Sequence, residues 1–272
     1  MDIAHLVEQV RVTPGQPARL AKRDPRAKLG LSDEDATKAE TAEIAREIDV
    51  LQDRLYAEGR RALLVTLQGT DTSGKDGTIR AVFNETGPLG VTATPFRRPT
   101  EDDLAHDYLR RAHIAAPRLG TIGIFNRSHY EDVLVAKVRN LVPAEEIEQR
   151  YAQINDFERM LTENGTRILK FMLHISKERQ AERLRDRLED PTKYWKFDPG
   201  DLEDRARWDE FMTAYEAAVT RCSTAYAPWH VVPADRKWVR NAVVARIVRA
   251  TLKEMDPQYP APSWAPGTYT IT

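Results

Sequence analysis

Five short apolar segments alternate with longer stretches of helical periodicity through the middle of the chain. These apolar segments cover residues 62–68, 91–96, 121–126, 167–175 and 229–234. Nearly continuous hydrophobicity is typical of strands that are buried on both faces, and strands that alternate with helices indicate βαβ units. The pattern therefore predicts an α/β fold with a mainly parallel sheet that helices cover on both faces.

Helical periodicity predicts the elements around these strands. A long helix is expected from about Ser32 to Glu58, with Gly59 as its end, because apolar residues recur one turn apart at Ile44, Ile48, Leu51 and Leu55. Further helices are expected at residues 75–85, 101–113, 128–140, 143–164, 176–189, 201–226 and 236–255.

The two ends of the chain lack such periodicity. Residues 1–33 are rich in charge and proline, and we expect an irregular N-terminal extension there. The proline-rich segment 256–272 is expected to run extended, over the surface or onto a neighbouring subunit.

Composition and charge restrict the class of protein. Hydrophobic residues make up 41% and charged residues 31% of the chain, a balance typical of soluble globular proteins. The formal net charge is −1, so an anion-binding surface must come from local clustering, which argues against a general nucleic-acid binder. The single Cys222 cannot form an internal disulfide, and neither a secretory signal nor an apolar run of ~18 residues is found. We therefore expect a cytoplasmic protein without a membrane partner.

A glycine-rich segment directly follows the first predicted strand. Residues 69–75 read Gly-Thr-Asp-Thr-Ser-Gly-Lys, which matches the G-x-x-x-x-G-K of a phosphate-binding loop. Such a loop turns its N–H groups inward, and both Lys75 and the dipole of the following helix favour an anion. The next residue is Asp76, where these loops normally carry the Ser or Thr that binds Mg²⁺.

Two acidic residues accompany this loop. Asp71 would repel a phosphate unless a divalent cation lay between them, so we interpret it as a metal ligand or a proton acceptor. Asp76 is open to two interpretations, because an acid in the first turn of a helix also stabilises that helix without any part in chemistry.

Polar residues follow the third predicted strand and should lie beside the loop, since ligands bind at the carboxyl ends of parallel strands. They are Asn126, Arg127 and Ser128. Arg127 has the forked geometry that grips phosphate, although a surface arginine paired with Glu131 or Asp132 is the alternative. Ser128 is also placed to cap a following helix.

Basic residues gather after the second and fourth strands. Arg179, Arg183 and Arg187 lie on one face of a predicted helix, which indicates either a solvated charged face or a lid over a polyanion. Lys193 and Lys196 extend this basic surface. Arg97 and Arg98 should approach the same rim.

Four segments together resemble the polyphosphate kinase 2 family. They are GTDTSGKDG, FRRPTEDDLAHDYLRRAH, IGIFNRSHYEDVLV and RLRDRLEDPTKYWKF, in the order found in that family and within residues 35–255. The resemblance implies a thymidylate-kinase-like P-loop fold of three layers, with a central five-stranded parallel sheet. It places a phosphotransferase domain at residues 34–255, with a helical lid at about 176–200.

The resemblance also implies an activity. It predicts Mg²⁺-dependent, reversible transfer of the terminal phosphate of inorganic polyphosphate to ADP and AMP, which forms ATP, with Mn²⁺ as an alternative metal. The family's loop carries an acid after the lysine, as Asp76 does here. Many members have Asp where this chain has Asn126, so Glu131 is the nearest replacement. The FNRSHYE version, with Glu131, resembles the subset that accepts both nucleoside monophosphates and diphosphates.

The resemblance assigns roles to individual residues. Catalysis is expected of Asp71, Lys75, Arg127 and Glu131, with Asp71 and Glu131 as metal ligands. Nucleotide and phosphate binding is expected of Gly69, Thr72, Ser73, Gly74, Asp76, Gly77, Arg97, Arg98, Asn126 and Ser128. Polyphosphate binding is expected of Arg80, Arg183, Arg187, Lys193 and Lys196. The expected partners are polyphosphate, adenine nucleotides, guanine nucleotides as further acceptors, and further copies of the chain in a homodimer or homotetramer.

Two other functions fit parts of the sequence. An ATP-dependent nucleoside or nucleotide kinase would share the fold, but its loop should end in GK followed by Ser or Thr. A non-catalytic regulator that binds nucleotides or polyanions would need neither Asp71 nor a complete lid.

Overall fold

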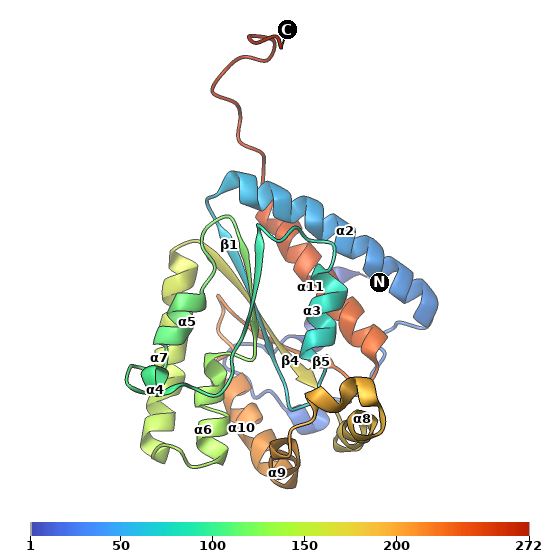
Figure 1. Ribbon diagram of the computed structural model, residues 1–272, viewed down its shortest axis with the longest axis vertical. Coiled ribbons are helices and arrows are strands. Elements are labelled where there is room, and N and C mark those ends of the chain that lie inside the picture. Colours follow the sequence, from blue (N-terminus) through green and yellow to red (C-terminus); the bar gives the residue numbers. More distant parts are fainter. Residues whose placement is uncertain (1, 272) are drawn as a thin grey trace.

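A five-stranded parallel sheet between two layers of helices forms the body of the molecule in the computed structural model, which describes residues 2–271 (Figure 1). The strands follow the order β2-β3-β1-β4-β5 across the sheet. They are β1 (Ala62–Gln68), β2 (Val91–Pro95), β3 (Ile122–Asn126), β4 (Thr166–His174) and β5 (Trp229–Pro233). All five predicted strands are thus confirmed. Because they are parallel, their carboxyl ends meet at one edge of the sheet.

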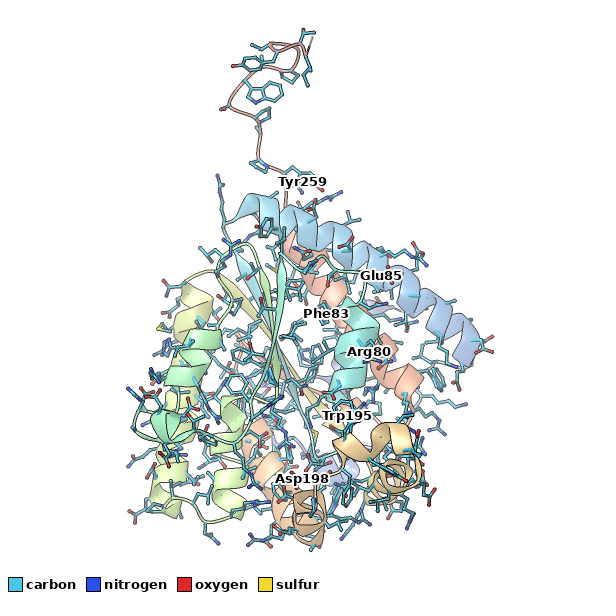
Figure 2. All side chains as sticks on the ribbon, viewed as in Figure 1. Arg80, Phe83, Glu85, Trp195, Asp198 and Tyr259 are labelled. Carbon is cyan, nitrogen blue, oxygen red and sulfur yellow. The ribbon has the colours of Figure 1, made fainter. Side chains whose placement is uncertain are left out.

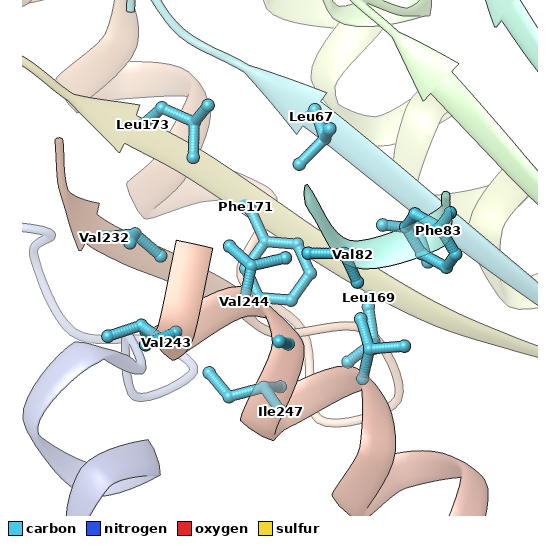
Figure 3. Close-up of a cluster of buried hydrophobic side chains, with 14 of the residues drawn as sticks. Leu67, Val82, Phe83, Leu169, Phe171, Leu173, Val232, Val243, Val244 and Ile247 are labelled. Atoms are coloured by element: carbon cyan, nitrogen blue, oxygen red, sulfur yellow. The ribbon is translucent and has the colours of Figure 1, made fainter. Parts of the chain in front are cut away.

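One face of the sheet is covered by the long helices α2 (Glu34–Glu58) and α11 (Lys237–Met255) and by the shorter α3 (Lys75–Phe83) (Figure 1). Asp33 caps the first turn of α2 by accepting a bond from the Ala36 N–H, and Gly59 ends this helix in a left-handed conformation at φ 66°. Figure 3 shows the core that results, in which Leu67, Leu169, Phe171 and Leu173 of the sheet pack against Val82 and Phe83 of α3 and Val243, Val244 and Ile247 of α11.

The opposite face carries α5 (Arg110–Ala115), α6 (Val135–Val138), α7 (Ala144–Glu163) and α10 (Trp208–Arg221) (Figure 1). Three helices expected as continuous are broken here. The segment 101–113 gives α4 (Glu101–Leu104) and α5, because the Asp107 carboxylate turns the backbone between them by accepting from the Leu109 N–H.

The other two interrupted helices follow β3 and precede β5. The segment 128–140 begins with a 3₁₀ turn, η2 (His129–Asp132), before α6, and the buried Val133 and Leu134 separate the two turns. The segment 201–226 divides into α9 (Gly200–Ala206) and α10, with Arg207 between them, and helix ends at Arg221.

A buried ion pair crosses the layer between the sheet and α7. The Lys170 ammonium lies 2.5 Å from Oε2 of Glu158, 2.9 Å from the hydroxyl of Tyr130 and 2.6 Å from the carbonyl of Cys222. Lys170 and Glu158 are both fully buried. Every ammonium proton therefore has an acceptor, as a charge in the interior requires.

The N-terminal segment packs into the fold, and the prediction of an irregular segment at 1–33 is wrong for residues 3–10 and 20–22, which are helical. They contain α1 (Ile3–Val10) and a 3₁₀ turn, η1 (Leu20–Lys22). Leu6 and Val10 are buried in the core against α11. The helix is only eight residues long, but Ile3, Leu6, Val7 and Val10 recur at helical spacing, so the sequence did contain a signal for it.

These residues also complete the free edge of the sheet. The Val12 N–H donates to the carbonyl of Trp229 on β5 over 2.8 Å, and Arg11 pairs with His230 in an antiparallel bridge. Further along, the Pro25 carbonyl accepts from the N–H of Asp235, just after β5. The N-terminal segment therefore covers the edge that β5 would otherwise expose.

The lid and the C-terminal tail lie at opposite ends of the molecule (Figure 1). The segment predicted as a lid, at about 176–200, contains α8 (Lys177–Glu189) and a 3₁₀ turn, η3 (Pro191–Lys196), and ends where α9 begins; we refer to α8, η3 and α9 together as the lid. The tail leaves α11 and projects away from the body, and its Trp264 and Tyr269 are exposed. The tail first contacts the surface of α2, where the Tyr259 hydroxyl donates to Oδ2 of Asp53 over 2.7 Å, and it projects away from the body beyond that point. Within residues 2–271, none of the helices combines the length and the apolar character that a membrane span requires.

Candidate functional site

The loop between β1 and α3 has the backbone shape of an anion cradle. Thr72 and Gly74 adopt left-handed conformations at φ 63° and 102°, and such alternation turns successive N–H groups to one side. A Cβ atom on Gly74 would lie 1.8 Å from Nη1 of Arg240. Glycine is therefore required at this position both by its φ angle and by the guanidinium packed against it.

Lys75 begins α3 and is nearly buried. Its ammonium folds back and donates to the carbonyls of Gly69, at 2.8 Å, and Thr70, at 3.3 Å. Burial and the neighbouring Arg127 lower the pKa of Lys75 to about 8. A phosphate in the loop would replace these carbonyls as acceptors and stabilise the charged ammonium.

Hydroxyl groups of the same loop lack partners. Those of Thr70, Thr72 and Ser73 are buried and have no hydrogen-bond partner within residues 2–271. Buried polar atoms are normally satisfied, so hydroxyls at a curled loop indicate a place for an oxygen-rich ligand. The loop thus has the donors that a phosphate group needs.

Arg127 connects the end of β3 to the loop. Its backbone is left-handed at φ 62°, and its N–H donates to the Leu67 carbonyl of β1 over 3.1 Å. The guanidinium forms an ion pair with Asp71 and lies 3.5 Å from Oε2 of Glu131. The pairing with Glu131 considered from the sequence is therefore present, but it faces the loop instead of the open surface. Asp132 pairs with Arg111 instead.

The carboxylate of Asp71 stays ionised in these surroundings. Burial alone would raise the pKa of Asp71, but the charges of Arg127 and Lys75 outweigh burial and lower it. Asp71 is thus a negative group held between cations beside the loop. It can receive a divalent cation without first losing a proton.

Asp201 of α9 lies against Asp71 and was not predicted as a site residue. Both carboxyl groups line the same cleft, and Arg187 donates to Oδ2 of Asp201 over 2.8 Å. Burial and the charge of Asp71 raise the pKa of Asp201 to about 6. The lid thereby delivers a second acid to the loop. The sequence offers no motif for it, because Asp201 is one of several acids in DPGDLED.

The donor set partly matches a magnesium site. Asp71 and Asp201 supply facing carboxylate oxygens, which hard divalent cations prefer. Glu131 contacts the other Nη atom of Arg127, so the expected metal pair of Asp71 and Glu131 has a guanidinium between its members. Among the residues described, no three His, Cys, Asp or Glu side chains are grouped closely enough to hold a metal ion by themselves. A cation here would therefore take further ligands from phosphate oxygens and water.

Asn126 and Asp76 face each other at the mouth of the loop. The Asn126 amide donates to Oδ1 of Asp76 over 2.7 Å. Ser128, in contrast, is fully buried, and its hydroxyl accepts from the Tyr130 N–H and from the Gln68 amide. It caps η2 as expected of an N-cap, but the structure places it outside the cleft, contrary to its expected phosphate contact.

A cleft of about 530 Å³ lies between the loop, the lid and the start of α11. It brings together most of the expected residues, namely Asp71, Thr72, Gly74, Lys75, Asp76, Gly77, Arg97, Asn126, Arg127, Arg183, Arg187, Lys193 and Lys196. Arg80 is not among its lining residues: Figure 2 shows it on α3, where it borders a separate hollow against β2. Arg98 is exposed beside the start of α9.

The basic residues of the lid differ in burial and in their interaction partners. Arg183 is buried, and its guanidinium donates to the carbonyls of Thr72 and Ala234, each over 2.8 Å. It therefore fixes the lid to the loop, whereas a direct grip on polyphosphate was expected. Lys193 is half-exposed and pairs with Asp190, and Lys196 lies 4.9 Å from the ring of Trp195, which is labelled in Figure 2.

Lys237 and Arg240 also line the cleft and were not predicted. They belong to the first turn of α11, directly after β5. The topological rule that placed Asn126 and Arg127 applies equally to this position, since β5 ends at the same edge of the sheet. The signal was therefore present in the sequence segment DRKWVR.

Comparisons with known proteins show which proteins the chain resembles. The family model described as polyphosphate kinase 2 (PPK2) matches residues 31–260. An AMP/ADP-polyphosphate phosphotransferase of Meiothermus ruber is 54% identical over 224 residues, which cover 82% of this chain and 84% of the relative. An ADP-polyphosphate phosphotransferase of Rhodopseudomonas palustris is 39% identical over 222 residues, or 77% of each chain. The crystal structure of polyphosphate kinase 2 from Arthrobacter aurescens TC1 superimposes with a TM-score of 0.92 at 42% identity, over 96% of this chain and 93% of that one.

Proposed function

The chain belongs to the polyphosphate kinase 2 family, and on that premise we propose that it transfers the terminal phosphate of inorganic polyphosphate to ADP and to AMP in a Mg²⁺-dependent reaction. The observation that carries the proposal is the cationic cleft over the loop. A phosphate cradle, a buried lysine and the lid's basic residues line one continuous space. Such a lining suits a polyanion along its length better than a single phosphate.

The chain's own residues account for the main requirements of phosphoryl transfer. The loop N–H groups and Lys75 hold the terminal phosphates, and Arg127 stabilises the charge on the group in transit. The bond between the last phosphorus atom and its bridging oxygen breaks. A new bond forms between that phosphorus atom and an oxygen of the acceptor's terminal phosphate. Catalysis then consists mainly of positioning and electrostatic stabilisation.

Asp71 and Asp201 are the residues that would hold a magnesium ion, together with the phosphates. A bound divalent cation supplies charge neutralisation between neighbouring phosphate groups, with Mn²⁺ as a substitute. In this role Asp71 would hold the cation beside the loop, and the charge of the cation would offset the repulsion between Asp71 and phosphate.

Acceptance of AMP as well as ADP is the finer part of the proposal. The Meiothermus ruber relative is named for both acceptors. In this chain Glu131 holds the second Nη atom of Arg127, and so sets how far the guanidinium reaches toward the acceptor. An arginine that reaches further can bind the single phosphate of AMP as well as the terminal phosphate of ADP.

The test is ATP formation by the purified protein with Mg²⁺ and long-chain polyphosphate, with AMP and ADP supplied separately. ATP from ADP, lost in Lys75→Ala and on addition of EDTA, is the expected result. ATP from AMP, in a preparation free of adenylate kinase, is expected for the broader acceptor range. GDP and GMP extend the same assay to guanine acceptors, and light scattering reports the dimer or tetramer that we expect.

Other outcomes identify the other functions. Activity with ATP as the donor and none with polyphosphate would indicate an ordinary nucleotide kinase. Binding of polyphosphate without turnover of either acceptor would indicate a regulator. ADP turnover without AMP turnover would leave the phosphotransferase intact and refute the role assigned to Glu131.

A further inference from the structure

We propose that the first turn of α11 forms a second phosphate-chain subsite beyond the loop, with Lys237 as its contact residue. This proposal rests on the proposed function and names where the untransferred part of the donor is held. It predicts that the enzyme distinguishes long donors from short ones at a residue that takes no part in the transfer itself.

The position of Lys237 follows from contacts around the loop. Nη1 of Arg240 donates to the carbonyl of Ser73 over 3.1 Å and packs against Gly74. Lys237 precedes Arg240 by three residues on the same helix, so their Cβ atoms lie about 5–6 Å apart on one face. Both residues line the cleft that contains Lys75. The cleft therefore continues from the loop to the start of α11.

Within residues 2–271, the cations Arg183, Lys237 and Arg240 at this end of the cleft form no ion pair with a carboxylate. Arg183 and Arg240 donate to backbone carbonyls and to the neutral amide of Asn241, which satisfies their geometry but leaves their charges. Within residues 2–271, Lys237 has no ion-pair partner. Neutral acceptors leave a net positive field that a polyanion would neutralise.

The other charged neighbours reinforce this field more than they weaken it. Burial and the charges of Arg183, Arg179 and Arg240 lower the pKa of Lys237. Asp186 is the acid that faces this group, and Arg179 is paired with Glu182. Cations that depress one another's protonation are stabilised when an anion binds between them.

Two kinds of donor near the first turn of α11 lack hydrogen-bond partners among the residues described. Nε of the buried Arg183 has no hydrogen-bond partner in the described part of the chain. The residue before α11, Arg236, gives no side-chain cap, so the first N–H groups of this 19-residue helix remain available. A helix start with free N–H groups favours an anion through both its donors and its dipole.

The chemistry of this turn selects a repeated phosphate over a nucleoside. Lys237 is its exposed side chain, whereas Trp238 is buried and offers no ring face for a base to stack on. A subsite of cations and N–H groups recognises charge at regular intervals and ignores base identity. Inorganic polyphosphate has that character beyond the phosphates held in the loop.

The experiment compares donors of different length in steady-state kinetics with ADP as the acceptor. Lys237→Met should raise KM for long-chain polyphosphate about threefold to tenfold, the effect of losing one charged phosphate contact. KM for ADP, and kcat at saturating donor, should stay within about twofold because Lys237 lies outside the transfer site. Tripolyphosphate, too short to fill both subsites, should be bound almost equally by variant and wild type, as substrate or as competitive inhibitor.

Matched variants separate this role from general effects of charge. Lys237→Arg should restore the wild-type KM, and Lys253→Met at the far end of the same helix should have no effect. If Lys237→Met raised KM equally for tripolyphosphate and for long chains, the proposed subsite would be wrong. An unchanged KM for donors of every length would also contradict it. If the wild-type protein gave no product from any polyphosphate, the proposed function itself would fail, a result distinct from both.

Discussion

Individual residues at the loop combine roles that are usually separate. Gly74 gives the loop its turn and leaves room for Arg240, while Arg127 joins the end of β3 to Asp71 and Glu131. Charges of both signs therefore meet beside the phosphate cradle before any ligand binds. The protonation of these groups should control phosphate binding directly.

Phosphate binding should weaken as the pH rises through the pKa of Lys75. That pKa is about 8 in the free protein, so the ammonium loses its proton between pH 7 and 9. Because phosphate binds the protonated form, the affinity for tripolyphosphate should fall across this interval. Isothermal titration calorimetry at constant Mg²⁺ measures this affinity at each pH.

Lys75→Arg serves as the control for this effect, because the guanidinium stays protonated throughout the range. Any remaining pH dependence in that variant belongs to the ligand or to other groups. An identical pH profile in the variant and the wild type would contradict a titrating Lys75.

Replacing Asp71 should impair catalysis more than folding. Asp71→Asn keeps the shape of the side chain but removes the charge that we propose holds magnesium, so kcat should fall at least ~100-fold. A higher Mg²⁺ concentration should recover part of the loss if the defect is metal binding. Circular dichroism checks that the variant folds, and full activity at ordinary Mg²⁺ would remove Asp71 from the mechanism.

The sequence identified the parts of the site that are local in the chain. A spacing of glycines and a lysine reveals the loop, and the residues after a strand reveal Arg127. Asp201 escaped notice because its partner Asp71 is far away in sequence, and only the folding of the lid brings them together. Arg183 was recognised as a lid residue, but its backbone acceptors belong to other elements and leave no pattern in the sequence.

At the scale of elements, the lid helix α8 and the loop behave as one unit. Arg183 links α8 to the carbonyl of Thr72 in the loop and to the carbonyl of Ala234 after β5. Ser176 caps α8 and donates its hydroxyl to Asp235. The lid therefore starts from a fixed base beside the cradle that it covers.

Arg183→Met should loosen this base. It removes hydrogen bonds from buried carbonyls, and we expect a loss of about 2–4 kcal/mol in unfolding free energy. Hydrogen exchange of the loop amides should become faster, and kcat should fall. Arg185→Met, on the exposed side of the same helix, is the matched control and should leave all three measurements near wild type.

Sequence patterns predicted strands better than short helices. The central strand at residues 62–68 is a nearly continuous apolar run that is buried on both faces, which makes its signal clear, whereas the edge strand β2 is largely exposed. The breaks near Asp107 and Arg207 depend on local turns whose effect periodicity does not register. The helix α1 was missed although Ile3, Leu6, Val7 and Val10 recur at helical spacing, because a pattern of only two turns is easily overlooked in a segment rich in charge and proline.

Across the whole molecule, charge is also used inside the core. Lys170 on the sheet and Glu158 on α7 form a pair with no access to solvent, and the charge of Lys170 lowers the pKa of Glu158 despite burial. Such a pair tolerates the loss of both charges better than the loss of one.

Glu158→Gln should therefore destabilise the fold by about 3–5 kcal/mol, since it leaves the ammonium of Lys170 buried without a counter-charge. Urea unfolding measures the change. The double variant Glu158→Gln/Lys170→Met should recover part of the loss. If the single variant were as stable as the wild type, the pair would not be ionised.

The N-terminal segment has a consequence for how the protein is made. Residues 3–12 are synthesised long before their partners on β5, Trp229 and His230. Leu6 and Val10 therefore remain exposed through most of translation, until α11 can cover them. Pairing of the N-terminal segment with β5 is thus a late folding event, because a long stretch of chain must first be synthesised and its ends brought together. Until then the apolar residues of the nascent chain are accessible to chaperones.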